Sequence, residues 1–197
     1  MPLAHLRANP STRLAVLALA TVVAATYRSD AAPARSHSAA IADFEQRVGG
    51  YIALHDRVAA RLGPLDTSRS QADIAARAAA MAKALRIARA GARRGDILTP
   101  EAGRLFRVMI GRQLAHRRLL PRADRDEPPG DRPAFTPFVN QIYPTSEPLA
   151  MVPPGVLRDL PPLPEALEYR FVRTHLILRD REANLIVDVL PSAAPPP

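Results

Sequence analysis

The 197-residue sequence contains no cysteine and no tryptophan, and it has only four tyrosines and five phenylalanines. The lack of cysteine excludes disulfide bonds, thiolate metal sites, iron–sulfur clusters and cysteine nucleophiles. The fold must therefore be held together by its hydrophobic core alone. Because aromatic residues are scarce, we expect that core to be a thin layer of Leu, Ile, Val and Ala side chains.

Long apolar runs are also absent, with one exception near the N-terminus. Arg7 and Arg13 precede the apolar run Leu14 to Ala25, and the small residues Ala32 to Ala34 follow it. This order is typical of a cleavable secretory signal peptide, cut after Ala34 or alternatively after Ala25. A helix that spans a bilayer needs about 20 residues, so a retained anchor is the less favoured alternative. We expect residues 1–34 to be removed on export and the mature chain to be periplasmic or secreted.

Basic residues outnumber acidic ones, 27 to 19. Loss of residues 1–34 would remove three arginines and one aspartate and lower the net charge from +8 to +6. A selected anion-binding surface would gather arginines on one face, namely Arg77, Arg86, Arg89, Arg93 and Arg94. The favoured alternative is compositional bias, because Lys83 is the only lysine and alanine is abundant. Nucleic-acid binding is not expected, because the arginines are scattered and aromatic stacking partners are missing.

Residues 35–120 form a predicted helical region, and its first helix shows apolar residues at steps of three and four from Ile41 to Leu62. Gly63 and Pro64 end it, because glycine permits a left-handed cap and proline cannot continue a helix. Two glycines, at positions 49 and 50, weaken the middle by about 1 kcal/mol each. Either a partner helix approaches closely there, or a well-packed helix tolerates them.

Two further helices are predicted before residue 120. The second covers about residues 70–90, with Gly91 as its cap, and its apolar stripe is Ile74, Ala78, Met81, Leu85 and Ala88. The third opens at Thr99-Pro100-Glu101, where threonine caps the helix and proline occupies its first position. Because the link between the first two helices is short, we expect them to form an antiparallel hairpin.

The C-terminal half changes character. Residues 121–137 mix charge, proline and glycine and are predicted to be a mobile linker. Residues 138–190 comprise a proline-rich extended arm, with one helical turn opened by Pro154, and three strand-like runs. Those runs, near 167–171, 175–179 and 185–190, predict a three-stranded antiparallel meander. Residues 191–197 are predicted to be a disordered tail. The fold class is therefore α+β.

Three segments together resemble a group of exported bacterial proteins of unknown biochemical role: FEQRVGGYIALHDRVAARLGPL, ARRGDILTPEAGRLFR and LPPLPEALEYRFVRTHLILRDREANLIVDVLP. The resemblance covers most of the mature chain, and the C-terminal segment is its most specific part. Members of the group usually carry a Gly-Arg-Asp type turn where this chain has Arg173-Thr174-His175. The last two strands also resemble the C-terminal hairpin of small periplasmic proteins associated with nickel and cobalt homeostasis, through a common strand pattern.

Metal-binding and catalytic motifs are absent from the sequence. No two histidines share a helix at i, i+4, and neither an HExxH motif, a GxSxG elbow nor a glycine-rich phosphate loop occurs. The segment Asp180 to Asn184 has the alternating oxygen ligands of a calcium loop but lacks its glycine and its final glutamate, so an ordinary turn is favoured. Asp180 and Asp188 are expected to be solvated acids at strand ends, and His55 a structural histidine at a helix interface.

Two hypotheses remain from the sequence. The favoured one is a non-catalytic envelope protein that binds another envelope protein through its proline-rich arm or an exposed hairpin edge, without a cofactor. The alternative is a metal-handling protein or an enzyme whose site is assembled from residues distant in sequence. His55, His116, Asp180 and Asp188 are the candidates for such a site, and they would have to converge in the folded chain.

Overall fold

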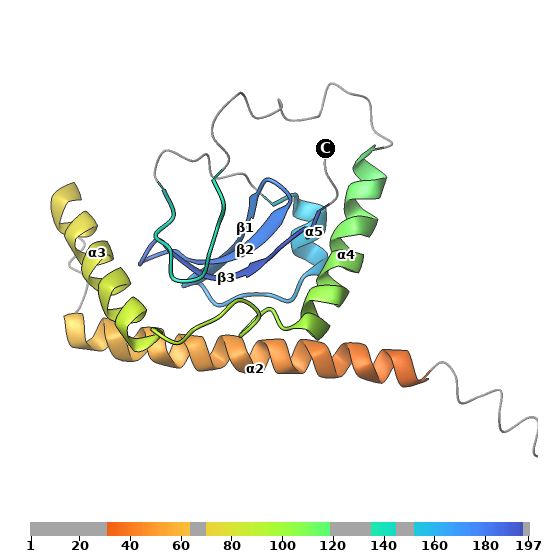
Figure 1. The fold of residues 1–197 in the computed structure, drawn as a ribbon, viewed down its shortest axis with the longest axis horizontal. Coiled ribbons are helices and arrows are strands. Elements are labelled where there is room, and N and C mark those ends of the chain that lie inside the picture. The colour runs from red at the N-terminus through yellow and green to blue at the C-terminus, as the bar shows by residue number, and fades with distance from the viewer. Residues whose placement is uncertain (1–30, 64–69, 119–134, 145–151, 195–197) are drawn as a thin grey trace, which may run out of the picture. The chain divides into compact units, whose positions relative to one another are not determined.

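The computed structural model describes residues 31–63, 70–118, 135–144 and 152–194. The chain divides into two units, Met1–Ala39 and Ala40–Pro197. The elements, shown in Figure 1, are α2 (Ala31–Leu62), α3 (Gln71–Ala88), α4 (Pro100–Arg118), α5 (Pro154–Asp159), β1 (Leu167–Val172), β2 (His175–Asp180) and β3 (Leu185–Leu190). Helices in the N-terminal half and an antiparallel sheet at the C-terminus confirm the α+β class. The predicted signal peptide lies mostly outside the described residues.

Helix α2 begins earlier than its apolar pattern, because the preceding residues are rich in alanine, which has the highest helix propensity. Its predicted stripe is buried at Phe44, Val48 and Val58, and it ends at Gly63 with φ +80°, as expected for a left-handed cap. Gly49 and Gly50 are exposed, and a Cβ at either would meet nothing within 4 Å. No element of the described chain approaches them closely, so the helix simply tolerates them.

Helix α3 carries a capping box between Ser70 and Asp73, and it buries Met81, Ala82 and Leu85. Ile74, which the predicted stripe placed on the buried face, is 45 % exposed. The buried apolar side chains of α3 therefore lie in its C-terminal half, and they pack mainly against the C-terminal part of α2 and the start of β3. Figure 1 shows α3 set obliquely to α2, so contact in the predicted helical hairpin is confined to one end.

Helices α4 and α5 begin where the sequence predicted. Thr99 Oγ1 accepts a hydrogen bond from Ala102 N (3.3 Å), and Pro100 occupies the first helical position. Pro154 opens α5 in the same way. Each proline lacks an N–H that would have no partner in the first helical turn, so the start of the helix is a favourable place for it.

The sheet has the order β1-β2-β3, and both pairings are antiparallel. Arg173 and Thr174 connect β1 to β2, with Arg173 at φ +54°, and the register pairs Val172 with His175. Part of the predicted arm pairs with β3: Asn140 N donates to Ile186 O, and Ile186 N donates to Gln141 O, both at 2.8 Å. This segment therefore covers the outer edge of β3.

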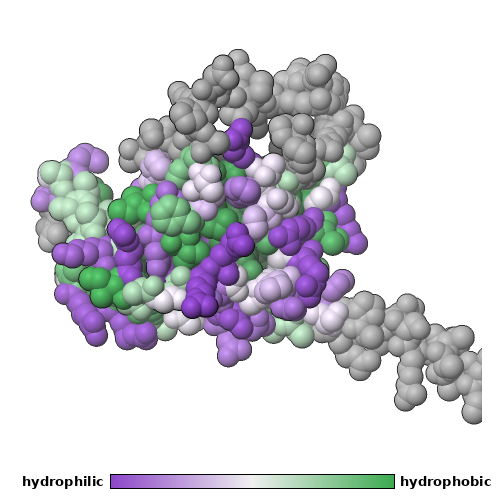
Figure 2. Space-filling model, viewed as in Figure 1, coloured by the Kyte–Doolittle hydropathy of each residue, from purple (hydrophilic) through white to green (hydrophobic). Residues whose placement is uncertain are grey.

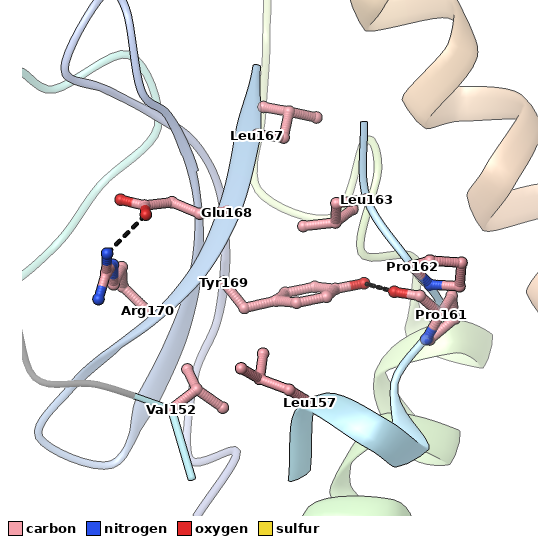
Figure 3. Close-up of a pocket in the computed structure, with 9 residues that line it drawn as sticks. All are labelled: Val152, Leu157, Pro161, Pro162, Leu163, Leu167, Glu168, Tyr169 and Arg170. Carbon is pink, nitrogen blue, oxygen red and sulfur yellow. Dashed lines mark hydrogen bonds and ion pairs between the residues drawn. The ribbon is translucent and has the colours of Figure 1, made fainter. Parts of the chain in front are cut away.

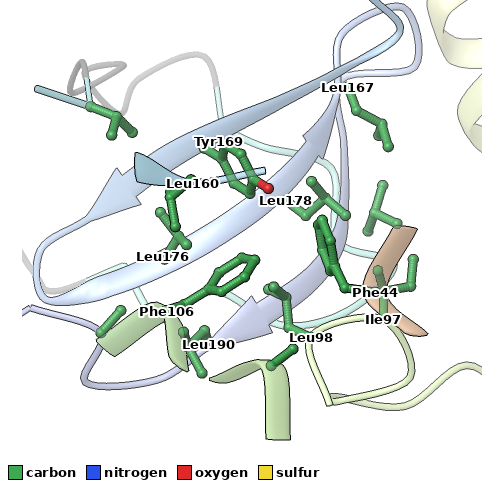
Figure 4. Close-up of a cluster of buried hydrophobic side chains, with 14 of the residues drawn as sticks. Phe44, Ile97, Leu98, Phe106, Leu160, Leu167, Tyr169, Leu176, Leu178 and Leu190 are labelled. Atoms are coloured by element: carbon green, nitrogen blue, oxygen red, sulfur yellow. The ribbon is translucent and has the colours of Figure 1, made fainter. Parts of the chain in front are cut away.

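The core lies between the helices and one face of the sheet (Figure 4). Phe44 from α2, Phe106 from α4 and Tyr169 from β1 meet at its centre, with ring centroids 5.1 Å apart for the two phenylalanines and 6.1 Å apart for Phe106 and Tyr169. The expectation of a purely aliphatic layer was wrong, because the few aromatic residues are concentrated here. Edge-to-face contacts of this kind add stability beyond area burial.

Two predicted boundaries need correction. Phe135, assigned to the mobile linker, packs against Tyr143 on the other face of the sheet. Ala193, assigned to the disordered tail, is buried, and Ala194 N donates to Thr174 O at 3.0 Å. The packing of Phe135 and Ala193 could not be predicted from the local sequence, because a single apolar residue among prolines carries no periodic signal. Residues 119–134 and 195–197 lie outside the described part.

Candidate functional site

The structure brings two of the four candidate residues together, His55 and Asp180. His55 lies on α2, one turn after Tyr51, and both side chains face Asp180 at the end of β2. Tyr51 Oη donates to Asp180 Oδ2, and His55 Nδ1 lies at hydrogen-bond distance from the same oxygen, both at 2.7 Å. Asp180 Oδ1 accepts from Ala183 N at 2.7 Å, which closes the β2–β3 turn. The turn is the one predicted, but Asp180 is fully buried rather than solvated.

An ion pair extends this cluster to α3. His55 Nε2 lies 3.5 Å from Glu182 Oε2, and Arg77 Nε donates to Glu182 Oε1 at 2.8 Å. Arg77 Nη1 also donates to the carbonyl oxygen of Gly63 at 2.8 Å. The cluster therefore joins the C-terminal end of α2, the N-terminal half of α3 and the turn between β2 and β3.

Two side chains of this cluster have raised pKa values. The hydrogen bond with Asp180 raises the pKa of His55 more than burial lowers it, and the carboxylates of Asp180, Glu182 and Asp56 add to the rise. Burial raises the pKa of Tyr51, and the neighbouring Asp180 carboxylate raises it further. Tyr51 therefore stays protonated at neutral pH and acts as a hydrogen-bond donor.

The cluster does not have the organisation of a catalytic or metal site. A catalytic histidine held by a carboxylate presents its second nitrogen to a nucleophile or to substrate, whereas Nε2 of His55 faces Glu182. Within the described residues, no group of three or more His, Asp or Glu side chains is arranged to hold a metal ion. The hydrogen bonds instead connect distant parts of the fold, which is a structural role.

Asp188 belongs to a different part of the molecule. Its Oδ2 accepts from Ile97 N and Leu98 N, both at 2.8 Å, and its Oδ1 accepts from Gly95 N at 2.9 Å. The side chain is fully buried, so the expectation of a solvated strand-end acid was wrong. It fixes the loop between α3 and α4 to β3. The side chain of His116 lies outside the described part, so only His55 and Asp180 are seen to meet.

The five arginines of the predicted anion-binding face do not share one face. Arg77 is held by Glu182, and Arg89 points inward, where Nη1 donates to Asn140 Oδ1 and Nη2 to Val187 O, both at 2.8 Å. The guanidinium of Arg89 also lies over the ring of Tyr51, 5.1 Å from its centroid. The other three are exposed: Arg86, Arg93 and Arg94.

A groove of about 300 Å³ lies beside β1 (Figure 3). Its walls are mostly apolar, and its lining includes Val152, Leu157, Pro161, Pro162 and Leu163. Tyr169 points from β1 towards the two prolines, and its hydroxyl donates to Pro161 O at 3.1 Å. Two charged residues of β1, Glu168 and Arg170, point to the other side of the strand. The volume is at the lower limit of small-molecule pockets, but it fits one or two side chains.

On the face of β1 opposite the groove, one buried polar atom has no partner. Arg170 Nη2 donates to Glu168 Oε2 at 2.6 Å, and Arg179 also pairs with Glu168. Burial alone would raise the pKa of Glu168, but hydrogen bonds from the two arginines outweigh it and lower the pKa. Nε of Arg170 is buried and has no hydrogen-bond partner among the described residues. Buried donors are nearly always paired, so this atom marks an incomplete interaction.

Strand β1 is the edge strand of the described sheet, with β2 as its one neighbour. Arg181 N donates to Ala166 O at 2.9 Å and so extends the pairing by one residue. Because main-chain groups alternate in direction along an antiparallel strand, those of Tyr169 and Phe171 point away from β2. No main-chain group in the described ranges pairs with them. A strand edge therefore adjoins the apolar groove.

No family model, curated protein or solved structure matches this chain. The site must be judged from its geometry.

Sequence reasoning anticipated an exposed hairpin edge but did not locate the groove. Its walls come from α5, from the Pro161–Leu163 segment and from β1, which no sequence motif links together. The one available signal was the spacing of prolines before the first strand, which indicates a rigid segment beside it. The partnerless nitrogen of Arg170 depends entirely on tertiary packing.

Proposed function

We propose that this chain is an exported, non-catalytic binding module of the bacterial envelope, and that it holds an extended segment of another protein along β1. The observation that carries the proposal is a strand edge with an apolar groove on one face of β1 and the unpaired Nε of Arg170 on the other face. The proposal includes membership of the exported bacterial group that the sequence resembles.

An added strand would complete the interactions at this edge. Main-chain groups of the partner would pair with those of Tyr169 and Phe171, as in β-strand addition. An apolar side chain of the partner would fill the space beside Leu157 and Leu163. On the opposite face of β1, a polar side chain of the partner would accept from Arg170 Nε. This hydrogen bond stabilises the complex because a buried donor without an acceptor costs about 1–3 kcal/mol.

The same geometry weighs against the metal-handling or enzymatic alternative. His55 and Asp180 meet, but the aspartate already receives hydrogen bonds on both oxygens and the histidine ring lies between two carboxylates. Asp188 is used to anchor a loop. No observation among the described residues favours a reaction, so the binding function is the one we put forward.

Site-specific photo-crosslinking tests the proposed surface. The chain has no cysteine, so Leu157→Cys, at a position 47 % exposed, can carry the only thiol-linked photo-crosslinker in the molecule. Val108→Cys on α4, at a position 50 % exposed, is the matched control. We expect an envelope fraction to give a discrete crosslinked product from position 157 that position 108 does not give. The product should map to one short segment of its partner.

Binding of a synthetic peptide distinguishes a specific complex in the groove from non-specific adhesion to the surface of the chain. A synthetic peptide of the crosslinked segment should bind the unlabelled chain, and Leu157→Asp should abolish that binding while Ile74→Asp, on exposed α3 surface, leaves it intact. Equal crosslinking from positions 157 and 108, or equal binding by both aspartate variants, would refute the groove as the binding surface.

Export is tested on the chain recovered from cells. We expect the protein in the envelope fraction to lack residues 1–34, or 1–25 if the earlier cleavage occurs, as read from its N-terminal peptide by mass spectrometry. Recovery from the cytosol with Met1 at its N-terminus would contradict the proposed location.

A further inference from the structure

A second surface, on the opposite side of α3 from its packed residues, combines positive charge with exposed apolar side chains. A notch of about 440 Å³ is lined by Lys83, Arg86, Ile87, Ala90 and Asn140. The first four belong to α3 or its C-terminal end, and the fifth belongs to the segment that pairs with β3. We refer to this surface as the α3 notch.

The notch is rigidly built. Asn140 Nδ2 donates to Arg89 O at 2.7 Å, and Arg89 Nη1 returns a hydrogen bond to Asn140 Oδ1 at 2.8 Å. Burial lowers the pKa of Arg89, and its contacts are directed inward, so its role is to hold the two walls together. The side chains of Lys83 and Arg86 are consequently carried on a fixed frame.

Lys83 and Arg86, the two cationic residues of the notch, form no ion pair with an acidic side chain among the described residues. This distinguishes them from Arg77, Arg104, Arg170 and Arg179, each of which pairs with a glutamate. Lys83 and Arg86 are three residues apart, so they project from neighbouring turns of one helix face. The face therefore presents local positive charge that the molecule itself does not neutralise.

Exposed apolar side chains accompany this charge. Ile87 is 68 % exposed within the notch, and Phe138 and Ile142, two residues on either side of Asn140, are 60 % and 47 % exposed. Figure 2 shows hydrophobic surface over the segment 135–144 with hydrophilic side chains beside it. Large apolar side chains next to unpaired cations are the combination that enters the headgroup region of a bilayer.

We propose that the α3 notch binds the surface of a membrane that contains anionic lipid. Lys83 and Arg86 contact lipid phosphates, and Ile87 enters the boundary between headgroups and acyl chains. The attraction depends on ionic strength, because charges near a membrane surface act over about one Debye length. The groove beside β1 belongs to different elements, so this inference does not rest on the proposed protein partner.

A fluorophore attached at one position of the full-length chain tests whether the α3 notch enters a membrane. Ile87→Cys carries a polarity-sensitive fluorophore, and Val108→Cys on α4 is the matched control. Vesicles of phosphatidylcholine mixed with phosphatidylglycerol should shift the emission at position 87 to the blue, and vesicles of phosphatidylcholine alone should not. The apolar run Leu14 to Ala25 is present in both labelled chains, so a local shift at position 87 cannot arise from that run alone.

Charge-reversal variants test whether Lys83 and Arg86 cause the binding. In the Ile87→Cys chain, Lys83→Glu with Arg86→Glu should weaken the vesicle response at least about tenfold, since each cation near an anionic surface contributes on the order of a fivefold change in binding. Arg104→Glu with Arg112→Glu, both exposed on α4, changes the net charge equally and should leave the response within about twofold. Raising the salt concentration to about 0.5 M should abolish the emission shift at position 87 of the chain without charge reversals.

Three outcomes would overturn the proposal. The first is no emission shift at position 87 with anionic vesicles. The second is an equal shift at position 108, which would mean adhesion through net charge or through the N-terminal run. The third is the same shift at position 87 with soluble polyphosphate in place of vesicles, which would make the notch a site for soluble polyanions.

Discussion

At the scale of single residues, two buried carboxylates have different roles from those expected of them. Asp188 receives three main-chain N–H groups of the loop before α4, and Asp180 receives a tyrosine, a histidine and a turn amide. Both are fully buried. A buried carboxylate is costly unless its lone pairs are used, and here each oxygen accepts at least one hydrogen bond.

Asp188→Asn should therefore be strongly destabilising. The amide replaces one acceptor oxygen with a donor that faces other donors, so we expect the free energy of unfolding to fall by about 3 kcal/mol, measured by urea denaturation. Asp159→Asn, at an exposed position that accepts from Gln113, should change it by less than about 0.5 kcal/mol. Similar losses from both variants would show that Asp188 does not anchor the loop.

His55 should make stability depend on pH. Its pKa is raised in the folded state, chiefly by the hydrogen bond with Asp180, so its stabilising contribution is complete below the unfolded value of 6.5 and is lost as pH rises through the folded value. His55→Asn keeps a donor towards Asp180 but does not titrate. The unfolding free energy of the parent chain should therefore fall as the pH rises above 6.5, and that of His55→Asn should not show this fall. Urea denaturation from about pH 5 to pH 9 measures both.

His175 provides the control for this measurement because its shift has the opposite sign. Burial lowers its pKa in the folded state, so its contribution is lost as pH falls below 6.5. His175→Gln should leave the decline above the unfolded value in place. If His55→Asn and the parent chain give parallel profiles, the proposed link between His55 and Asp180 is incorrect.

At the scale of elements, α4 contains two glycines with opposite surroundings. A Cβ at Gly103 would lie 2.7 Å from Leu190 Cδ1, whereas a Cβ at Gly111 would meet nothing within 4 Å. Gly103 therefore lets α4 approach β3 closely, whereas no close approach in the described chain requires a glycine at position 111.

We expect Gly111→Ala to raise the free energy of unfolding by about 0.5–1 kcal/mol, because alanine loses less backbone entropy in a helix. Gly103→Ala should gain nothing or be destabilising, since buried Leu190 would have to move. Thermal unfolding of the two variants provides the comparison. Equal stabilisation by both would mean that the α4–β3 contact is not tight.

Element by element, the sequence predicted the helix starts and the strands better than the packing between them. Thr99, Pro100 and Gly63 act locally through capping and backbone geometry, so their effect can be read from neighbouring residues. The angle of α3 and the exposure of Ile74 depend on which face finds a partner. Periodicity marks an apolar stripe but does not say how much of it is covered.

At the scale of the whole molecule, the described core begins after the predicted signal peptide. Among the side chains that the structure describes, the first fully buried one is Phe44, and the second of the two units of the chain begins at Ala40. No helix in the described ranges has the length and apolarity needed to cross a membrane.

A chain that starts at Arg35 should accordingly fold as stably as the full-length chain. We expect its midpoint of thermal unfolding, followed by circular dichroism at equal protein concentration, to lie within about 2 °C of the full-length value, because no buried contact of the core is removed. A large fall in the midpoint, or loss of a cooperative transition, would show that residues 1–34 are part of the folded protein.

The sequence alone determined the α+β class, the absence of disulfides and the capping residues, because these follow from composition and local backbone chemistry. Tertiary structure decided the contacts of the buried Asp180 and Asp188, the meeting of Tyr51 and His55 with Asp180, and the groove beside β1. Each of these joins residues far apart in the chain. Their relative positions depend on how helices pack on a sheet, and no local pattern of residues encodes that geometry.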